Sequence, residues 1–207
     1  MVEPIQYSSL IGSDYSCIKR ADTAGLRRVL DDEMYLAVKT CSKYHQDRLK
    51  SVQDTWGALV TNIDYISDSE DDQLHTRVLP YTINTEAGHC NKTIAILEHF
   101  LTNVDDARKY LVIVDDDTVL GVSRLVQLIS CYSSDPVLML GQRYGYMAAT
   151  GQGYNYPTGG AGMVFSREAV KKLLDAGCRC SAPDTPDDML LGRCAVKAGI
   201  PLLHSNR

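Results

Sequence analysis

Long apolar runs are missing from this 207-residue sequence, which excludes a membrane-spanning helix, because such a helix needs about 20 consecutive apolar residues. A basic stripe is missing as well. The net charge is -5, which argues against nucleic acid as the main partner. The first residues, Met1 to Gln6, lack the basic and apolar regions of a secretory signal. Taken literally, the sequence predicts a cytosolic chain without a membrane anchor.

Two common nucleotide-binding fingerprints are also missing. The glycine-rich residues 158–162 are not followed by Gly-Lys-Ser/Thr, so they form no Walker loop. They also lack the Gly-x-Gly-x-x-Gly spacing of a dinucleotide site. The small residues here, Gly159 and Gly160 among them, would let the backbone approach a ligand or a metal ion closely. The alternative is a tight turn that leads into a strand.

Cysteine, in contrast, is plentiful. The seven cysteines are Cys17, Cys41, Cys90, Cys131, Cys178, Cys180 and Cys194. This number is high for a cytosolic enzyme and indicates an oxidising, secretory compartment. A zinc site is the weaker interpretation, because one residue separates Cys178 from Cys180 and no second close pair follows. The odd count predicts at least one free thiol or a partner outside the sequence.

The remaining pattern is that of a globular α/β domain, with 44% hydrophobic and 23% charged residues. Strands are predicted at 33–41, 62–67, 110–114, 137–140 and 163–165, and helices at 44–59, 88–101, 123–132, 166–174 and 186–198. This alternation predicts a mostly parallel sheet flanked by helices. Residues 141–162 are rich in Gly and Tyr, too aromatic for a plain linker. Residues 1–32 are polar, with a short helical candidate at 22–30, and are interpreted as a linker or the tail of a preceding region.

Three consecutive carboxylates, Asp115, Asp116 and Asp117, follow the apolar run 110–114. Placing them together is costly, because like charges repel and each raises the pKa of its neighbour. A manganese or magnesium ion relieves that repulsion and can hold a diphosphate. Ligands bind outside the carboxyl ends of strands in such sheets, which favours a metal–nucleotide site here. The alternative is a solvated acidic turn that caps the next helix.

A second acidic pair, Asp187 and Asp188, directly follows Pro186. Proline in the first helical turn with acids after it is typical of a helix N-terminus, so capping is one interpretation. The other is a carboxylate positioned as a general base.

Cations accompany both acidic motifs. Lys39 and Thr40 end the first predicted strand, and Arg48 and Lys92 lie on the first two predicted helices. Beside an acidic metal site, such cations would neutralise diphosphate oxygens. The alternative for each cation is an ordinary surface charge.

Four motifs occur in one order along the chain. They are Ala37-Val38-Lys39-Thr40-Cys41-Ser42-Lys43-Tyr44-His45, Val114-Asp115-Asp116-Asp117, Thr158-Gly159-Gly160-Ala161-Gly162 and Pro186-Asp187-Asp188. This order resembles the Fringe-like family of inverting β-1,3-glycosyltransferases over roughly residues 33–205. Residues 111–118, 162–170, 178–180 and 187–189 are most similar to the branch of that family that adds glucose to O-linked fucose on thrombospondin type 1 repeats.

The resemblance implies a GT-A fold with a Rossmann-like nucleotide-binding half, a UDP-sugar donor and Mn²⁺, with Mg²⁺ as the alternative. It implies an O-fucosylated thrombospondin type 1 repeat as acceptor and the lumen of the endoplasmic reticulum as location. Inverting transfer is one in-line displacement that needs a base for the acceptor hydroxyl and a cation for the leaving diphosphate. The implied roles are Asp188 as base, Asp117 and Asp115 as metal ligands, and Arg48, Asp116, Lys39, Thr40, Lys92, Gly159 and Gly160 as donor contacts.

The sequence departs from the family pattern at both ends. The family has a second metal-ligating histidine beyond the position of Ser205, whereas this sequence ends at Arg207 and His204 lies too early to replace it. The family's signal or anchor is also not found here. We therefore expect residues 33–207 to be a catalytic domain cut at its C-terminus. Transfer of N-acetylglucosamine or galactose is one alternative, and an inactive sugar- or protein-binding fragment is another.

Overall fold

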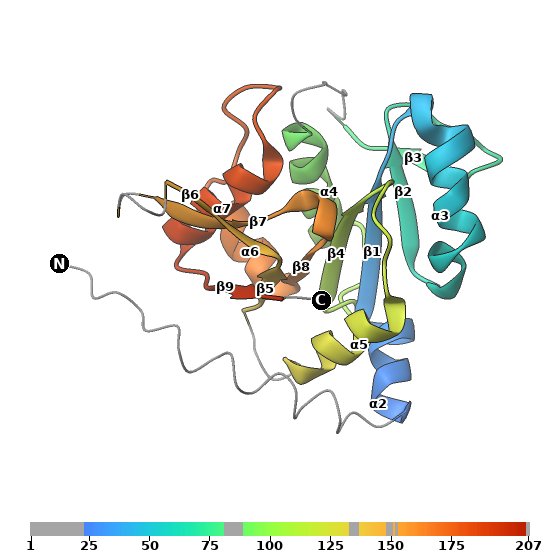
Figure 1. Ribbon diagram of the computed structural model, residues 1–207, viewed down its shortest axis with the longest axis horizontal. Coiled ribbons are helices and arrows are strands. Elements are labelled where there is room, and N and C mark those ends of the chain that lie inside the picture. The colour runs from blue at the N-terminus through green and yellow to red at the C-terminus, as the bar shows by residue number, and fades with distance from the viewer. Residues whose placement is uncertain (1–22, 81–88, 133–136, 148–150, 152, 206–207) are drawn as a thin grey trace.

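The computed structural model describes residues 23–80, 89–132, 137–147, 151 and 153–205, which build one large sheet with helices on both faces (Figure 1). The strands of this sheet are β1 (Met34–Lys39), β2 (Ile63–Ser67), β3 (Thr76–Val78), β4 (Tyr110–Asp115), β5 (Met139–Gly141), β8 (Met163–Ser166) and β9 (Leu202–His204). Their order is β3-β2-β1-β4-β8-β5-β9. β8 runs antiparallel to β4 and β5, and the other pairs are parallel. The prediction of a mostly parallel α/β sheet is confirmed.

Helices cover both faces of the sheet. One face is covered by α4 (Cys90–Thr102), α6 (Arg167–Asp175) and α7 (Asp187–Ala198), and the other by α2 (Thr23–Arg28), α3 (Lys50–Asp54) and α5 (Val122–Cys131). Figure 1 shows α3 and α4 on opposite sides of β1. Single helical turns are η2 (Val29–Glu33), η3 (Ser42–Tyr44), η4 (His45–Leu49), η5 (Trp56–Leu59) and η7 (Gly159–Ala161).

The two central strands, β1 and β4, contribute side chains to the hydrophobic clusters on both faces of the sheet. In β1, Leu36 packs with the cluster under α3 and α5, while its neighbour Ala37 packs with the cluster under α4, α6 and α7. In β4, Val112 and Ile113 divide in the same way. Burial on both faces explains why these strands read as uninterrupted apolar runs in the sequence. It also fixes their carboxyl ends at one edge, where Lys39 lies beside Asp115 in the strand register.

Several predicted boundaries are confirmed to within a few residues. The Ser166 side chain accepts a hydrogen bond from the backbone N–H of Ala169, as expected for the cap of α6. The packed region extends slightly upstream of residue 33, because Val29 in η2 is 1% exposed. Most of the predicted linker, residues 1–22, lies outside the described residues. Within the described ranges, no helix is both long and apolar enough to cross a membrane.

Residues 141–162, to which the sequence assigned no element, contain a hairpin. Its strands are β6 (Arg143–Tyr146) and β7 (Tyr154–Pro157), which pair antiparallel as a separate small sheet. The alternation of Tyr with smaller residues is a strand pattern. It was missed because the glycines in the same stretch indicate a loop.

The cysteines form disulfides where a zinc site was the alternative. Cys90 is bonded to Cys180, and Cys178 to Cys194. The zinc interpretation is therefore wrong for this segment. Among the described residues Cys41 is a free thiol, as the odd count predicted. Two disulfides are consistent with folding in an oxidising compartment.

Candidate active site at the carboxyl edge of the sheet

The sequence motifs meet at one edge of the sheet. β1 and β4 end there with Lys39 and Asp115 side by side. β8 runs in the opposite direction, so the glycine-rich turn η7 that precedes it enters at the same edge. The first turn of α7 also reaches this edge, through an ion pair between Asp187 and Lys39. Residues more than a hundred positions apart in the sequence therefore share one site.

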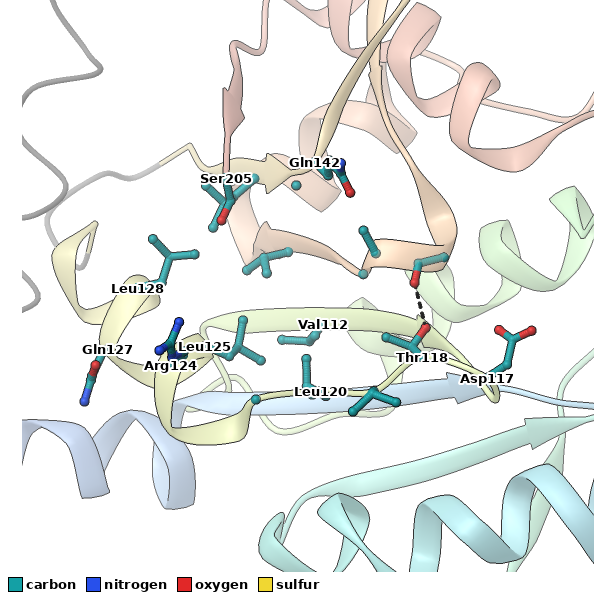
Figure 2. A pocket seen from close by; sticks show the side chains of 18 residues that line it. Val112, Asp117, Thr118, Leu120, Arg124, Leu125, Gln127, Leu128, Gln142 and Ser205 are labelled. Atoms are coloured by element: carbon teal, nitrogen blue, oxygen red, sulfur yellow. Dashed lines mark hydrogen bonds between the residues drawn. The ribbon is translucent and has the colours of Figure 1, made fainter. Parts of the chain in front are cut away.

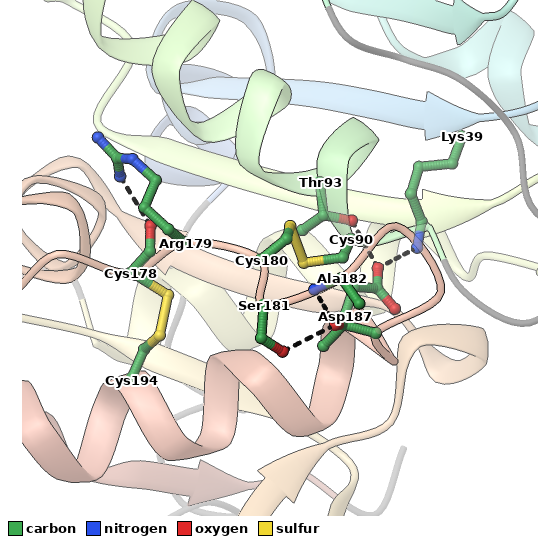
Figure 3. Close-up of a disulfide and its surroundings, with 11 residues drawn as sticks. Lys39, Cys90, Thr93, Cys178, Arg179, Cys180, Ser181, Ala182, Asp187 and Cys194 are labelled. Carbon is green, nitrogen blue, oxygen red and sulfur yellow. Dashed lines mark hydrogen bonds and ion pairs between the residues drawn. A yellow bond between two sulfur atoms is a disulfide. The ribbon is translucent and has the colours of Figure 1, made fainter.

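Lys39 joins the two acidic motifs. Its Nζ lies 3.0 Å from Oδ1 of Asp115 and 2.6 Å from Oδ2 of Asp187. The Thr93 hydroxyl, from the first turns of α4, donates to the same Asp187 oxygen at 2.5 Å (Figure 3). The Lys39 side chain is only 3% exposed, so the surface-charge alternative is wrong for this residue. Whether Lys39 also contacts a diphosphate stays a prediction.

The electrostatics of this cluster follow from burial and charge. Burial alone would raise the pKa of Asp187, but the Lys39 ammonium outweighs it and lowers that pKa to about 2. Burial would likewise lower the pKa of Lys39, yet its two carboxylate partners raise it above the ordinary value. Both groups are therefore held in their charged forms. Asp187 is a fixed anion and a poor proton acceptor.

Asp188 has the opposite environment. Burial raises its pKa, and the neighbouring anion Asp187 raises it further. Its Oδ1 accepts a hydrogen bond from the backbone N–H of Met189 at 2.6 Å, and the backbone N–H of Gly159 also points to this carboxylate. Two adjacent carboxylates whose pKa values are pushed apart divide into an anion and a proton acceptor. The capping interpretation holds only in part, because Asp187 bonds Lys39 and Thr93, while Asp188 accepts from the first turn of α7.

The other two acids of the first motif differ from Asp115. Asp116 is buried, accepts a hydrogen bond from the Thr40 hydroxyl at 2.8 Å, and has a pKa raised by burial. Asp117 is 55% exposed, and its Oδ2 lies 2.9 Å from Nη1 of Arg48. The Arg48 guanidinium also stacks over the Tyr44 ring, 4.0 Å from its centre. An exposed carboxylate and a half-exposed guanidinium thus lie together on the solvent-exposed side of this cluster.

The helix-capping alternative for this motif is wrong. The helix that follows, α5, begins only at Val122, and its N-cap is Gly121 without a side-chain cap. Asp115 to Asp117 instead lead into a turn in which the Thr118 N–H bonds the Asp115 carbonyl.

Asp117 and Asp115 are the predicted metal ligands, and each already takes part in an ion pair. One oxygen of Asp117 lies 2.9 Å from Arg48, and one oxygen of Asp115 is paired with buried Lys39. Metal binding by either residue stays a prediction. In the described part of the chain, no three His, Cys, Asp or Glu side chains converge as a metal cage. Magnesium-type ions commonly use one or two carboxylates and take their other ligands from substrate phosphates and water. An exposed Asp117 suits such a shared site.

Lys92 and the two glycines complete the predicted set. Lys92 is 1% exposed and donates to the Thr40 carbonyl, and burial lowers its pKa to about 8. Lys92 thus holds the backbone just after β1 in place from inside the protein, so the interpretation as an ordinary surface charge is wrong for this residue too. Gly159 is buried beside Asp115 and Lys39, whereas Gly160 is exposed. Contact of these three residues with a donor stays a prediction.

A cavity of about 560 Å³ opens beside Asp117, between α5 and the β4–β8–β5 part of the sheet (Figure 2). Its walls include Leu125, Val164 and Gln142, and Thr118 closes it toward η7 by donating to the Gly160 carbonyl at 3.0 Å. The sequence predicted no site role for Thr118 or Thr93. Thr118 directly follows the acidic motif, which was the available signal, whereas the hydrogen bond from Thr93 to Asp187 depends on how α4 and α7 pack together.

Comparison with known proteins gives a consistent picture. Residues 29–207 match the family model described as Fringe-like. The chain is 50% identical over 177 residues to the β-1,3-glucosyltransferase of Mus musculus, covering 86% of this chain and 36% of that protein. It is 51% identical over 173 residues to the Homo sapiens β-1,3-glucosyltransferase, covering 84% and 34%. It is 28% identical over 158 residues to the β-1,3-N-acetylglucosaminyltransferase lunatic fringe of Danio rerio, covering 69% and 42%.

Proposed function

Because the chain belongs to the Fringe-like family, we propose that it is the sugar-transferring part of a β-1,3-glycosyltransferase. It spans 36% and 34% of the two relatives that it matches at 50% and 51% identity, so the activity of a whole protein is part of this proposal. The observation that carries it is the ion-paired Lys39, which brings Asp115 and Asp187 into one site. Asp188 and Asp117, which we propose as the base and the metal ligand, are close sequence neighbours of these two carboxylates.

In the proposed reaction, Asp188 accepts the proton of the acceptor hydroxyl as that oxygen attacks the anomeric carbon of the donor sugar. Its raised pKa suits this role, since a base must bind a proton as well as release it. Asp187 stays anionic on Lys39 and Thr93 and fixes the first turn of α7. The proton and the leaving diphosphate are thus handled by different residues, and no covalent intermediate on the protein is required.

On the donor side, Asp117 would hold the divalent cation, which when bound stabilises the negative charge of the leaving diphosphate. Arg48, whose side chain is 40% exposed, would bind phosphate oxygens. Asp116 and Thr40 are hydrogen-bonded to each other and hold the turn that carries Asp117. Manganese is the proposed cation, with magnesium as the alternative.

The finer proposal is transfer of glucose from UDP-glucose to the 3-hydroxyl of O-linked fucose on thrombospondin type 1 repeats, in the endoplasmic reticulum. Support comes from two relatives at 50% and 51% identity that carry the name β-1,3-glucosyltransferase, against 28% for lunatic fringe. The disulfides support an oxidising compartment. Transfer of N-acetylglucosamine is the second candidate.

The test is a donor panel with one acceptor. The 207-residue chain would be incubated with UDP-glucose, UDP-N-acetylglucosamine or UDP-galactose, an O-fucosylated thrombospondin repeat, and either manganese or EDTA. We expect manganese-dependent transfer from UDP-glucose and none to the unfucosylated repeat. Faster transfer from another donor contradicts the finer proposal. No transfer and no hydrolysis of any donor contradicts the enzyme itself and favours a binding fragment.

A further inference from the structure

The β6–β7 hairpin carries a continuous surface of tyrosines. In its register Tyr144 lies opposite Tyr156, and Tyr146 lies opposite Tyr154. Residues two apart in a strand project from the same face, so all four rings share one side of the hairpin. Their centres are 6.2, 5.5 and 6.5 Å apart for the pairs 144–156, 146–154 and 154–156. We call these four residues the tyrosine patch.

The patch is only partly used for packing. Tyr154 and Tyr156 are half-buried, whereas Tyr144 is 50% and Tyr146 is 45% exposed. A single exposed aromatic residue is ordinary, but a cluster that extends from the core into solvent is typical of a binding surface. Packing within the fold therefore does not account for the two exposed rings, Tyr144 and Tyr146.

The patch lies next to the candidate base. β7 packs directly on α7: a Cβ at Gly192 would lie 2.5 Å from Cβ of Tyr156, so only glycine permits this approach. Figure 1 shows β6 and β7 beside α7. Burial raises the pKa of the Tyr154 phenol, the guanidinium of exposed Arg193 lowers it, and the Asp188 carboxylate adds to the rise, so Asp188 is close enough to Tyr154 to influence it. Gly159, two residues after the end of β7, donates a backbone hydrogen bond to the Asp188 carboxylate.

This position decides which substrate the patch would serve. The donor diphosphate is drawn to Arg48 and Asp117, whereas the phenol rings of the patch carry no charge to attract it. The acceptor hydroxyl, in contrast, must reach Asp188, so the acceptor sugar has to lie near the start of α7. Tyrosine offers an apolar ring face and a hydroxyl that hydrogen-bonds, which matches the C–H faces and hydroxyls of a pyranose.

We propose that the tyrosine patch is the acceptor subsite, where a 6-deoxyhexose of the acceptor stacks and presents its hydroxyl to Asp188. This rests on the proposed function of the same site. A deoxy sugar with a methyl group at C6 suits such a surface, because the methyl group adds apolar area against the rings. The patch would thus determine acceptor specificity, while Arg48 and Asp117 serve the donor.

The test compares acceptor and donor binding in surface variants. Methyl α-L-fucoside would be titrated into the wild-type chain, Tyr146→Ser, Tyr144→Ser and Tyr146→Phe, with binding followed by NMR. We expect the serine variants to weaken fucoside binding about tenfold, in line with the loss of one aromatic contact, and Tyr146→Phe to change it less than about threefold. The apparent affinity for UDP-glucose should stay unchanged in every variant.

Leu59→Ser is the matched control, since Leu59 is a 63% exposed apolar residue on η5, a turn whose Trp56 packs in the core cluster on the opposite face of the sheet from α7. It should bind fucoside as the wild type does. Equal fucoside affinity in wild type and both serine variants overturns the inference, as does a wild type that binds no fucoside. The proposed function is judged separately, by donor hydrolysis and transfer. A wild type that transfers glucose while the serine variants keep their acceptor KM contradicts the patch and leaves the proposed enzyme standing.

Discussion

At the scale of single residues, the central finding is the division of labour between Asp187 and Asp188. They are adjacent in sequence, yet Asp187 pairs with Lys39 and Thr93, while Asp188 faces the backbone of Gly159 and Met189. Substituting each in turn should therefore give different phenotypes.

For Asp188→Asn we expect turnover to fall by about 10² to 10⁴, the usual contribution of a general base. UDP-glucose affinity should not change, because the base acts on the acceptor. Single-turnover kinetics and donor titration measure the two effects. Loss of donor affinity, or unfolding, would support the capping interpretation of this residue instead.

The pH dependence of turnover has a defined sign. Asp188 must be deprotonated to act, and its pKa is raised by burial and by Asp187. Activity should therefore fall on acidification, at a pH above the ordinary range of an aspartate. A pH profile of kcat over the acidic range checks this, and the same limb should vanish from the residual activity of Asp188→Asn.

Asp117→Asn should abolish manganese-dependent transfer and leave the melting temperature nearly unchanged, because this side chain is 55% exposed. The lost contact to a metal-bridged diphosphate is expected to cost several kcal/mol of transition-state stabilisation. Manganese titration and thermal unfolding measure the two quantities. Near-normal turnover would refute Asp117 as a metal ligand, and Asp115→Asn tests the second predicted ligand in the same way.

Lys39→Met should destabilise the fold by about 3–5 kcal/mol, because Asp115 and Asp187 lose a buried partner. Denaturant unfolding measures this change. The control is Lys50→Met, since the Lys50 side chain is 55% exposed and pairs with Asp54 on the surface. Similar unfolding midpoints for the two variants would show that the bridge contributes little.

At the scale of elements, two disulfides hold the segment between α6 and α7. Cys178 and Cys180 lie in this segment and are bonded to Cys194 of α7 and to Cys90 at the start of α4 (Figure 3). The start of α4 also carries Thr93, which bonds Asp187. The Cys90–Cys180 bond therefore ties the start of α4 to the segment that leads into α7, whose first residues are Asp187 and the candidate base Asp188.

Replacing Cys90 and Cys180 by serine should lower the free energy of unfolding by about 2–4 kcal/mol, since the bond closes a loop of 90 residues. Turnover should fall with it, because α4 and α7 are no longer tied beside Asp187. Chemical unfolding and transfer assays under the same conditions measure both. Cys41→Ser, which removes a free thiol, should leave the unfolding midpoint close to that of the wild type.

At the scale of the whole molecule, the buried ion pair between Lys39 and Asp187 makes the free energy of unfolding depend on pH. The folded-state pKa of Asp187 is about 2, below its ordinary value of 3.8. Its ionisation therefore stabilises the fold above pH 4 by about 2 kcal/mol, and this contribution is lost as the pH falls toward 2. Thermal unfolding between pH 5 and 2 should show the loss, and Asp187→Asn should flatten it.

The strand–helix alternation, the mostly parallel sheet, the family, and the place of Asp115 to Asp117 at a strand end could all be predicted from the sequence alone. These features are encoded locally, because an apolar run buried on both faces and a turn of polar residues after it are contiguous in the chain. Three other features emerge only from the folded structure. Lys39 pairs with Asp115 and Asp187, Asp188 rather than Asp187 has the raised pKa, and the tyrosine hairpin packs on Gly192. The disulfide partners of the cysteines also emerge only there. Each of these depends on contacts between distant segments and on the burial that they create, and no local pattern carries that information.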